Sequence, residues 1–320
     1  MKLTEIKTEN IFSKDKYFNA CHASTILKHE NKLLCAFFAG TEEKNDDVEI
    51  FLCVNENDKW SEPKRMTFFD GEPCWNPVLF EKDEIIFLFF KVGKKISRWR
   101  TYVMKSYDGG VSFSEPCELV EGDIGGRGPV KNKPILLSDG KIAAPASIES
   151  SIKWDAFIDY SADGGNTWQK SELMPFDHKT AKGKGVIQPT LWESDGKIYA
   201  FLRSTESRIY LARSSDLIHF DKFVQTDLPN NNSGIDCVKV HESVVLIFNP
   251  IEEDWGDRNI IAYTITDDNG ETFSEPVIIE YDEDTDAEFS YPAIITDGEY
   301  VYVTYTSYRK TIRFRKFKIV

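Results

Sequence analysis

The chain has 320 residues, of which 41% are apolar and 13% aromatic, so it holds enough apolar material for a packed core. Its formal net charge of −14 argues against nucleic acid and anionic membranes as partners. No apolar run is long enough to span a membrane, and the first residues lack the apolar core of a signal peptide, so we expect a cytoplasmic protein.

A turn-like segment recurs along the chain at a nearly constant interval. Its best copies are residues 106–113, 161–168 and 266–273, with a shortened copy at 214–220 and a degenerate one at 54–60. The copies start 52 to 55 residues apart, and the chain accommodates six units of this length. A repeat of this size predicts one supersecondary unit copied around an axis or along a stack.

Each copy has the composition of a tight turn between two strands. In residues 161–168, a Ser, an Asp and two Gly precede a closing Trp. Short polar side chains bond nearby backbone, glycine accepts positive φ, and the aromatic can anchor the turn beneath its sheet. Apolar segments flank the copies, as at 208–212 and 260–263, so the pattern predicts β-hairpins.

A second element recurs between the turns and often contains a proline. Its six copies start at residues 23, 76, 133, 188, 234 and 291. Proline suits the first residues of a strand, so we predict that these are the innermost strands of six blades. The residues at or just before each start would then ring a central channel: His22, Trp75, Asn76, Lys133, Gln188, Ser233 and Tyr291.

Together the two repeats predict an all-β fold, a six-bladed β-propeller formed by residues 1–320 as a single domain. The last unit supplies three strands of its own, near residues 291, 301 and 312. We expect residues 2–6 to add the missing outer strand and so close the ring.

The cysteines and histidines predict neither disulfides nor a metal site. None of the six cysteines forms a Cys-x-x-Cys pair, and several lie in apolar, strand-like context, so we expect buried free thiols. The five histidines lack the spacing of zinc ligands. No cofactor is implied.

These repeats resemble those of the sialidase superfamily, whose members are six-bladed propellers with Asp-box turns and a sugar site on the axis. The turn segments described above match the Asp-box, and the resemblance covers nearly the full length of the chain. It implies that the Asp-boxes lie on the face away from the site, so function depends on individual positions elsewhere.

The resemblance implies a set of site residues. Two arginines that hold a substrate carboxylate would be Arg203, at the end of a strand-like segment, and Arg258, which follows an Asn-Pro pair. The tyrosine nucleophile that opens the last inner strand would be Tyr291. The general acid, an aspartate in the loop after the first strands, would be Asp47, with Asp46 as the alternative.

Two positions depart from the family pattern. His22 stands where the family has its first arginine, and Gln188 stands where it has the glutamate that takes the tyrosine proton. An amide cannot accept that proton, and the lost guanidinium removes one side of the carboxylate clamp. The sequence is therefore similar to a divergent branch of the superfamily rather than to an ordinary retaining sialidase.

Other polar residues complete the list of candidates. Lys133 and Arg309 could add positive charge for an acidic sugar, and Arg309 fits a surface position equally well. His22 could replace the missing base, because its ordinary pKa suits that role, or it could only form hydrogen bonds in the channel. Glu149 could bind hydroxyls or act as the base, and Asn76 could bind sugar or merely satisfy a strand end.

We therefore expect a carbohydrate-active enzyme that hydrolyses the glycosidic bond of a small acidic oligosaccharide, with sialic acid or a uronate at the site. A uronate lyase that uses His22 and Tyr291 as base and acid is the first alternative. The second is a propeller that binds sugar without turning it over, for which Asp47→Asn would be harmless.

Overall fold

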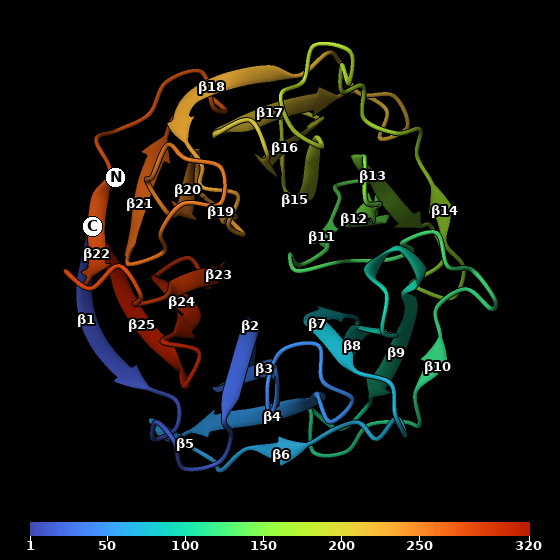
Figure 1. Cartoon of the computed structure of the whole chain (residues 1–320), viewed down its shortest axis with the longest axis vertical. Coiled ribbons are helices and arrows are strands. Elements are labelled where there is room, and N and C mark those ends of the chain that lie inside the picture. Colours follow the sequence, from blue (N-terminus) through green and yellow to red (C-terminus); the bar gives the residue numbers. More distant parts are fainter.

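The computed structural model describes all 320 residues and shows six antiparallel sheets arranged around one axis. Viewed down its shortest axis, the molecule is a ring in which the first strand of each sheet lies nearest the centre (Figure 1). The only helical element is the short 3₁₀ turn Ile96–Arg98, and no helix has the length and apolar character needed to cross a membrane. The predicted six-bladed all-β propeller is confirmed.

The strands are numbered in chain order. From the axis outward, blade one contains β2 (Ala20–His29), β3 (Lys32–Gly40), β4 (Glu49–Glu56) and β5 (Lys59–Trp60), and β6 (Lys64–Arg65) also pairs with β4. Blade two contains β7 (Cys74–Lys82), β8 (Ile85–Val92), β9 (Arg100–Ser106) and β10 (Cys117–Glu118). Blade three contains β11 (Ile135–Leu136), β12 (Ile142–Glu149), β13 (Trp154–Ser161) and β14 (Gln169–Lys170). Blade four contains β15 (Val186–Ser194), β16 (Lys197–Ser204), β17 (Arg208–Ser214) and β18 (Val224–Pro229). Blade five contains β19 (Asp236–Val240), β20 (Ser243–Phe248), β21 (Ile260–Thr266) and β22 (Val277–Tyr281). Blade six contains β23 (Phe289–Thr296), β24 (Tyr300–Ser307), β25 (Thr311–Ile319) and β1 (Leu3–Asn10).

The N-terminal strand closes the ring as the sequence predicts. Strand β1 pairs antiparallel with β25, with Leu3 opposite Ile319 and Asn10 opposite Arg313. The last blade therefore combines both ends of the chain, which lie close together in Figure 1. Closure of this kind covers a sheet edge that would otherwise expose unpaired backbone groups.

The Asp-boxes form the turns between the third and fourth strands of their blades. In the third blade, Ser161 Oγ accepts a hydrogen bond from the backbone N–H of Gly165 at 2.8 Å, and Asp163 Oδ1 accepts one from that of Thr167 at 2.9 Å. The closing Trp168 is buried edge-on against Phe89 of the preceding blade. Each box therefore shapes its own turn and anchors it to the neighbouring blade.

The inner strands share an irregularity that directs side chains toward the axis. The register with the second strand breaks after His22, Trp75, Ile187 and Ser290. The residue that follows each break has a left-handed backbone, with φ between 42° and 54° at Ala23, Asn76, Gln188 and Tyr291. Such bulges re-aim a side chain and are frequent at functional sites.

Blades three and five depart from the predicted register. Their left-handed residues are Lys131 (φ 68°) and Asn232 (φ 59°), two residues before the starts predicted at Lys133 and Gly234. The chain forms no regular strand at these two points, because β11 begins only at Ile135 and β19 only at Asp236. The repeat of prolines and apolar residues marks regular strands, so it does not indicate left-handed residues that lie before a strand.

All six cysteines are free thiols, as expected, and five of them are buried in the blades. The exception is Cys117 on β10, which is exposed because its two-residue strand lies at the outer edge of blade two.

Candidate functional site

The candidate site lies at the end of the channel opposite the Asp-boxes. There the starts of the inner strands meet the loops that join the second and third strands of each blade. These loops supply Glu43 in blade one, Arg258 in blade five and Arg309 in blade six, while β16 supplies Arg203. The cluster occupies the side of the channel formed by blades four, five, six and one.

Arg203 is the most deeply buried cation of this cluster, with 3% of its surface exposed. Its Nη1 donates to Gln188 Oε1 at 3.1 Å and to the Tyr291 phenol oxygen at 2.8 Å. Its Nε and Nη2 both donate to Asn232 Oδ1, at 3.2 and 2.8 Å. None of these partners is a carboxylate, so neutral groups hold the guanidinium, which forms no direct ion pair.

Tyr291 lies between the two predicted substrate arginines. The centre of its ring is 5.7 Å from the Arg203 guanidinium and 5.8 Å from that of Arg258. On another side, the ring centroids of Tyr291 and His22 are 4.2 Å apart. The structure therefore brings together Arg203, Arg258, Tyr291, His22 and Gln188, as the sequence predicted.

Glu288 binds two arginines and so fixes the charge distribution of the cluster. Its Oε1 accepts from Arg258 Nη1 at 3.1 Å, and its Oε2 accepts from Arg309 Nε at 2.7 Å. Burial opposes its ionisation, but the guanidinium groups of Arg309 and Arg258 hold the pKa of Glu288 well below its usual range. Glu288 is therefore a carboxylate, which leaves Arg258 with one ionic partner and N–H donors to spare.

Arg309 is neutralised twice. Besides Glu288, it binds Glu43, whose Oε2 lies 2.6 Å from Arg309 Nη1. Burial opposes the charge, yet these two carboxylates raise the pKa of Arg309 above its usual range. Arg309 thus lies in the cluster, where it anchors Glu288 and the loop of Glu43.

His22 is a neutral imidazole. Burial and the neighbouring Arg309 lower its pKa well below the usual range, although Glu288 opposes the shift. Its Nδ1 lies 2.8 Å from Thr306 Oγ1 and 4.0 Å from Glu288 Oε1. The imidazole is uncharged and lies at a tilt beside the Tyr291 ring, where its lowered pKa makes it a weak base.

Glu149 ends β12 in blade three, beside Ser147, whose hydroxyl binds the backbone N–H of Gln188 at 2.7 Å. Burial raises the pKa of Glu149 above its usual range, although Arg203, Lys91 and Lys184 oppose the shift. Its side chain forms no hydrogen bond with the protein. A carboxyl group with a raised pKa and no hydrogen-bond partner is suited to donate a proton to a ligand.

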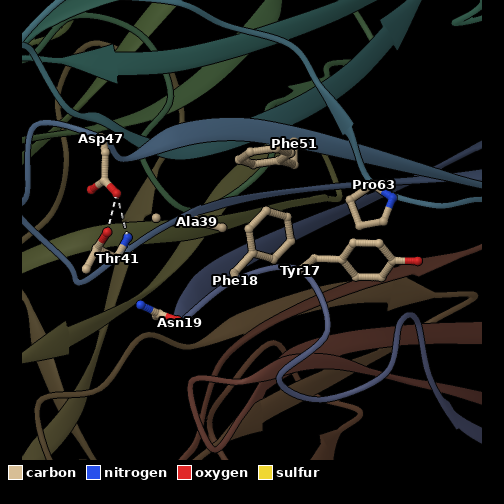
Figure 2. Close-up of a pocket in the computed structure, with 9 residues that line it drawn as sticks. Tyr17, Phe18, Asn19, Ala39, Thr41, Asp47, Phe51 and Pro63 are labelled. Carbon is tan, nitrogen blue, oxygen red and sulfur yellow. Dashed lines mark hydrogen bonds between the residues drawn. The ribbon is translucent and has the colours of Figure 1, made fainter.

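Four candidates lie outside this cluster. Asp47 is on the outer side of its loop, where its carboxylate binds the backbone N–H of Thr41 at 2.9 Å and lines a separate cavity (Figure 2). Asp46 is exposed and pairs with Lys94 at 2.7 Å. Lys133 pairs with the buried Asp236 at 3.0 Å. Asn76 is buried at the bulge of β7 and forms no side-chain hydrogen bond.

Sequence reasoning missed four residues of this region. Glu43 lies in the same acidic loop as Asp47, and Glu288 ends an acidic run that begins at residue 280. Asn232 belongs to a run of three consecutive asparagines, a signal that a search for strands did not use. Lys131 lies two residues before the predicted strand start, and its ammonium group reaches the carbonyl of Ile235 at 2.8 Å across the channel.

No group of three or more histidine, cysteine, aspartate and glutamate side chains has the arrangement of a metal site. The chemistry of the cluster is that of guanidinium groups, a phenol, an imidazole and an ionised carboxylate, and Glu149 of blade three adds a carboxyl group with a raised pKa.

Comparison with known proteins identifies one family. The BNR repeat-like domain matches residues 31–303 of this chain. No curated protein matches its sequence. Among solved structures, a Dyadobacter fermentans protein of unknown function is 16% identical, with a TM-score of 0.76 and 99% of both chains covered.

Two sialidases share the fold at similar levels. The Trypanosoma rangeli sialidase in complex with the inhibitor DANA is 14% identical with a TM-score of 0.74, over 97% of this chain and 59% of its own length. The NanB sialidase from Streptococcus pneumoniae is 13% identical with a TM-score of 0.75, over 97% of this chain and 70% of its own. This chain thus spans less than two thirds of the trypanosomal enzyme, and identities this low establish the fold alone.

Proposed function

We propose that this protein is a glycoside hydrolase acting on an acidic sugar. The chain belongs to the BNR repeat-like domain family, and it shares its fold with sialidases. The observation that carries this proposal is Arg203, a buried guanidinium without an ionic partner in a protein of net charge −14. A buried charge without a counter-ion is costly, and an anionic ligand removes that cost.

The arginines divide the task of binding a carboxylate. Arg203 contributes its charge, because its N–H groups already bind Gln188, Asn232 and Tyr291. Arg258 contributes hydrogen bonds, because Glu288 uses only its Nη1. A sialic acid or uronate carboxylate between Arg258 and Arg203 would bring the sugar ring over Tyr291.

The remaining groups fit a displacement at the anomeric carbon. Glu149 donates its proton to the glycosidic oxygen as the bond from that oxygen to the anomeric carbon breaks. The phenol oxygen of Tyr291 attacks the carbon, and its proton passes to His22. Water then replaces the phenol as the reverse proton transfers regenerate the enzyme. The family resemblance implies Asp47 as proton donor, but its carboxylate faces the separate cavity on the outer side of its loop, so this proposal gives the step to Glu149.

An activity screen with a matched pair of variants tests this proposal. Purified protein is offered sialosides and uronate-containing oligosaccharides, and reducing-end release is followed. We expect Glu149→Gln to lower kcat by about 10²- to 10⁴-fold, the range typical of a lost general acid. The exposed Glu121→Gln serves as control and should leave kcat unchanged.

The pH profile adds an independent criterion. Because a general acid must carry its proton, wild-type activity should fall as the pH rises through the raised pKa of Glu149. A Glu149→Gln protein with wild-type turnover and the same alkaline limb would exclude Glu149 as the acid. Silence of the wild type on every acidic substrate would favour a sugar-binding propeller.

A uronate lyase is the second candidate, and the amide of Gln188 beside Tyr291 favours it. A lyase needs no carboxylate at that position, because His22 removes the proton next to the uronate carboxyl group and Tyr291 protonates the leaving oxygen. The product would contain a carbon–carbon double bond, so ultraviolet absorbance in the same screen separates lyase from hydrolase.

A further inference from the structure

A cavity of about 170 Å³ lies on the outer side of blade four, and none of its lining residues belongs to the channel cluster. The segment between β14 and β15 forms one wall, and residues of blade four between positions 206 and 223 form the other. A cavity of this size is smaller than most small-molecule sites, so it is restricted to a small ligand. Its main lining residues are Phe176, Asp177, Glu206, Tyr210, Lys222 and Phe223.

Three aromatic rings meet at this blade-four cavity. The ring centroids of Phe176 and Tyr210 are 5.7 Å apart, and that of Phe223 lies 6.1 Å from the first and 6.0 Å from the second. The ring planes are inclined to one another by 61° to 80°, and all three side chains are only partly buried. A cation that rests against these rings can lie within about 6 Å of all three centroids, the range of cation–π attraction.

Two carboxylates beside the rings add negative charge, and neither Asp177 nor Glu206 forms an ion pair. Glu206 accepts from the backbone N–H groups of Lys182 and Gly183 at 3.0 and 2.8 Å, and Asp177 accepts a backbone N–H of its own turn at 3.0 Å. These bonds hold the two carboxylates in place without neutralising them. Burial and the nearby Glu206 carboxylate raise the pKa of Tyr210, so the charge of Glu206 acts directly on the aromatic wall.

The lining favours a cation that needs no hydrogen bonds. A primary ammonium ion has three N–H donors to satisfy, and ring faces give it few acceptors. A quaternary ammonium ion has no N–H group and binds through its charge and through contact with ring faces. Lys222, which is exposed, is the only cation that lines the cavity, so the two carboxylates leave the lining net negative.

From these contacts we propose that the blade-four cavity binds a small quaternary ammonium ion, such as choline. The site is separate from the channel, so its ligand does not depend on the reaction proposed there. Because the lining is net negative, a ligand that also carries an anionic group is repelled. The ligand is thus the free cation and not the phosphorylated head group of a lipid.

Calorimetry with three probes tests the proposal: choline, phosphocholine, and 3,3-dimethylbutan-1-ol, which has the shape of choline without its charge. We expect choline to bind at least about tenfold more tightly than the other two. Glu206→Gln should weaken choline binding by about 5- to 10-fold, and Phe176→Leu should weaken it by a similar factor because a ring face is lost. Lys222→Met should instead strengthen it by about 2- to 5-fold, because the opposing charge is removed.

Asp195→Asn is the matched control, because Asp195 is exposed at the turn between β15 and β16 of the same blade and does not line the cavity. It should leave the affinity for choline within about twofold, since a distant exposed charge is screened. Equal binding of choline and its uncharged analogue would overturn the proposal, because the cavity would then recognise shape alone. A loss in Asp195→Asn as large as in Glu206→Gln, or weaker choline binding in Lys222→Met, would also overturn it. Tighter binding of phosphocholine than of choline would exclude the free cation as the ligand.

Discussion

At the scale of single residues, the charge of Arg203 dominates the channel. Gln188 stands next to it and contributes an amide oxygen where a carboxylate would neutralise it. An amide in place of a carboxylate at this position thus leaves the positive charge of Arg203 without an ion pair. It also leaves Tyr291 without an adjacent carboxylate base, which assigns proton transfer to His22 in the proposed mechanism.

Gln188→Glu tests the role of this free charge. The new carboxylate would lie about 3 Å from Arg203 Nη1 and neutralise it, so an anionic ligand gains less from binding. We expect the affinity for an acidic monosaccharide to fall at least tenfold, which corresponds to about 1.4 kcal/mol. Calorimetry measures this change, and thermal unfolding checks that the fold is retained.

The exposed Gln225→Glu is the control, because it adds the same charge far from the axis on β18. If it weakens binding as much as Gln188→Glu does, the effect is one of total charge and not of Arg203. If Gln188→Glu binds the acidic sugar as tightly as the wild type, the free charge of Arg203 does not drive recognition.

At the scale of elements, the Asp-box joins a turn to a blade interface. Its first glycine only supplies positive φ, whereas its second also lies against the preceding blade. In the third blade, Gly164 (φ 71°) has open space where a Cβ would be, but a Cβ on Gly165 (φ 85°) would lie 3.1 Å from Phe87. Gly164 is therefore needed only for its backbone conformation, whereas Gly165 is also needed for close packing against the preceding blade.

Alanine substitution at these glycines separates the two contributions. Gly164→Ala should cost about 1–2 kcal/mol, the strain of a left-handed alanine. Gly165→Ala should cost about 1–3 kcal/mol more, because the methyl group overpacks the interface with Phe87. Urea unfolding measures both. Equal losses would mean that the blade interface accommodates the methyl group and that backbone strain is the only term.

Acid should weaken the Asp-boxes. Hydrogen bonds from Ser112 lower the pKa of Asp108 to about 2, and for Asp268 bonds from Thr272 outweigh burial and also lower the pKa to about 2. A carboxyl group with a lowered pKa stabilises the folded state above its unfolded pKa, and this contribution is lost as the pH falls from about 4 to about 2. We expect the free energy of unfolding to decrease over that window.

Asp268→Asn should make this decrease shallower, because the variant cannot titrate at that turn. Unfolding midpoints at a series of pH values measure the slope. An unchanged slope would show that other carboxyl groups govern the acid sensitivity.

At the scale of the whole molecule, the blades are joined at the axis by buried polar contacts as well as by apolar packing. Asp236 on β19 binds Lys133 at 3.0 Å, the Thr190 hydroxyl at 2.6 Å and the backbone N–H of Ile294 at 3.0 Å. These partners belong to blades three, four and six. Lys131 adds a further tie to blades five and six, and burial lowers its pKa to about 7.

Asp236→Asn should destabilise the propeller strongly. It removes the ionic partner of Lys133 in the channel, and the loss of one member of a buried pair costs about 3–5 kcal/mol. The exposed pair of Asp139 with Lys141 offers the control, for which Asp139→Asn should cost less than about 1 kcal/mol. Similar losses for the two variants in urea unfolding would show that Asp236 does not hold the blades together.

The sequence by itself determined the number of blades, the closure by the N-terminal strand and most of the cluster around Tyr291. These features give rise to local sequence repeats, because every Asp-box adopts the same turn conformation and most inner strands begin in the same way. Gln188 is in register with these repeats and could be placed at the channel from them, whereas Arg203 was placed there by the family resemblance.

Only the tertiary structure decided which side chain of a loop reaches the channel. Asp47 and Glu43 lie four residues apart, yet one faces an aromatic cavity and the other faces Arg309. Lys131 and Asn232 likewise owe their positions to bulges outside regular strands. Contacts between distant blades set these directions, and the sequence of a single loop does not contain them.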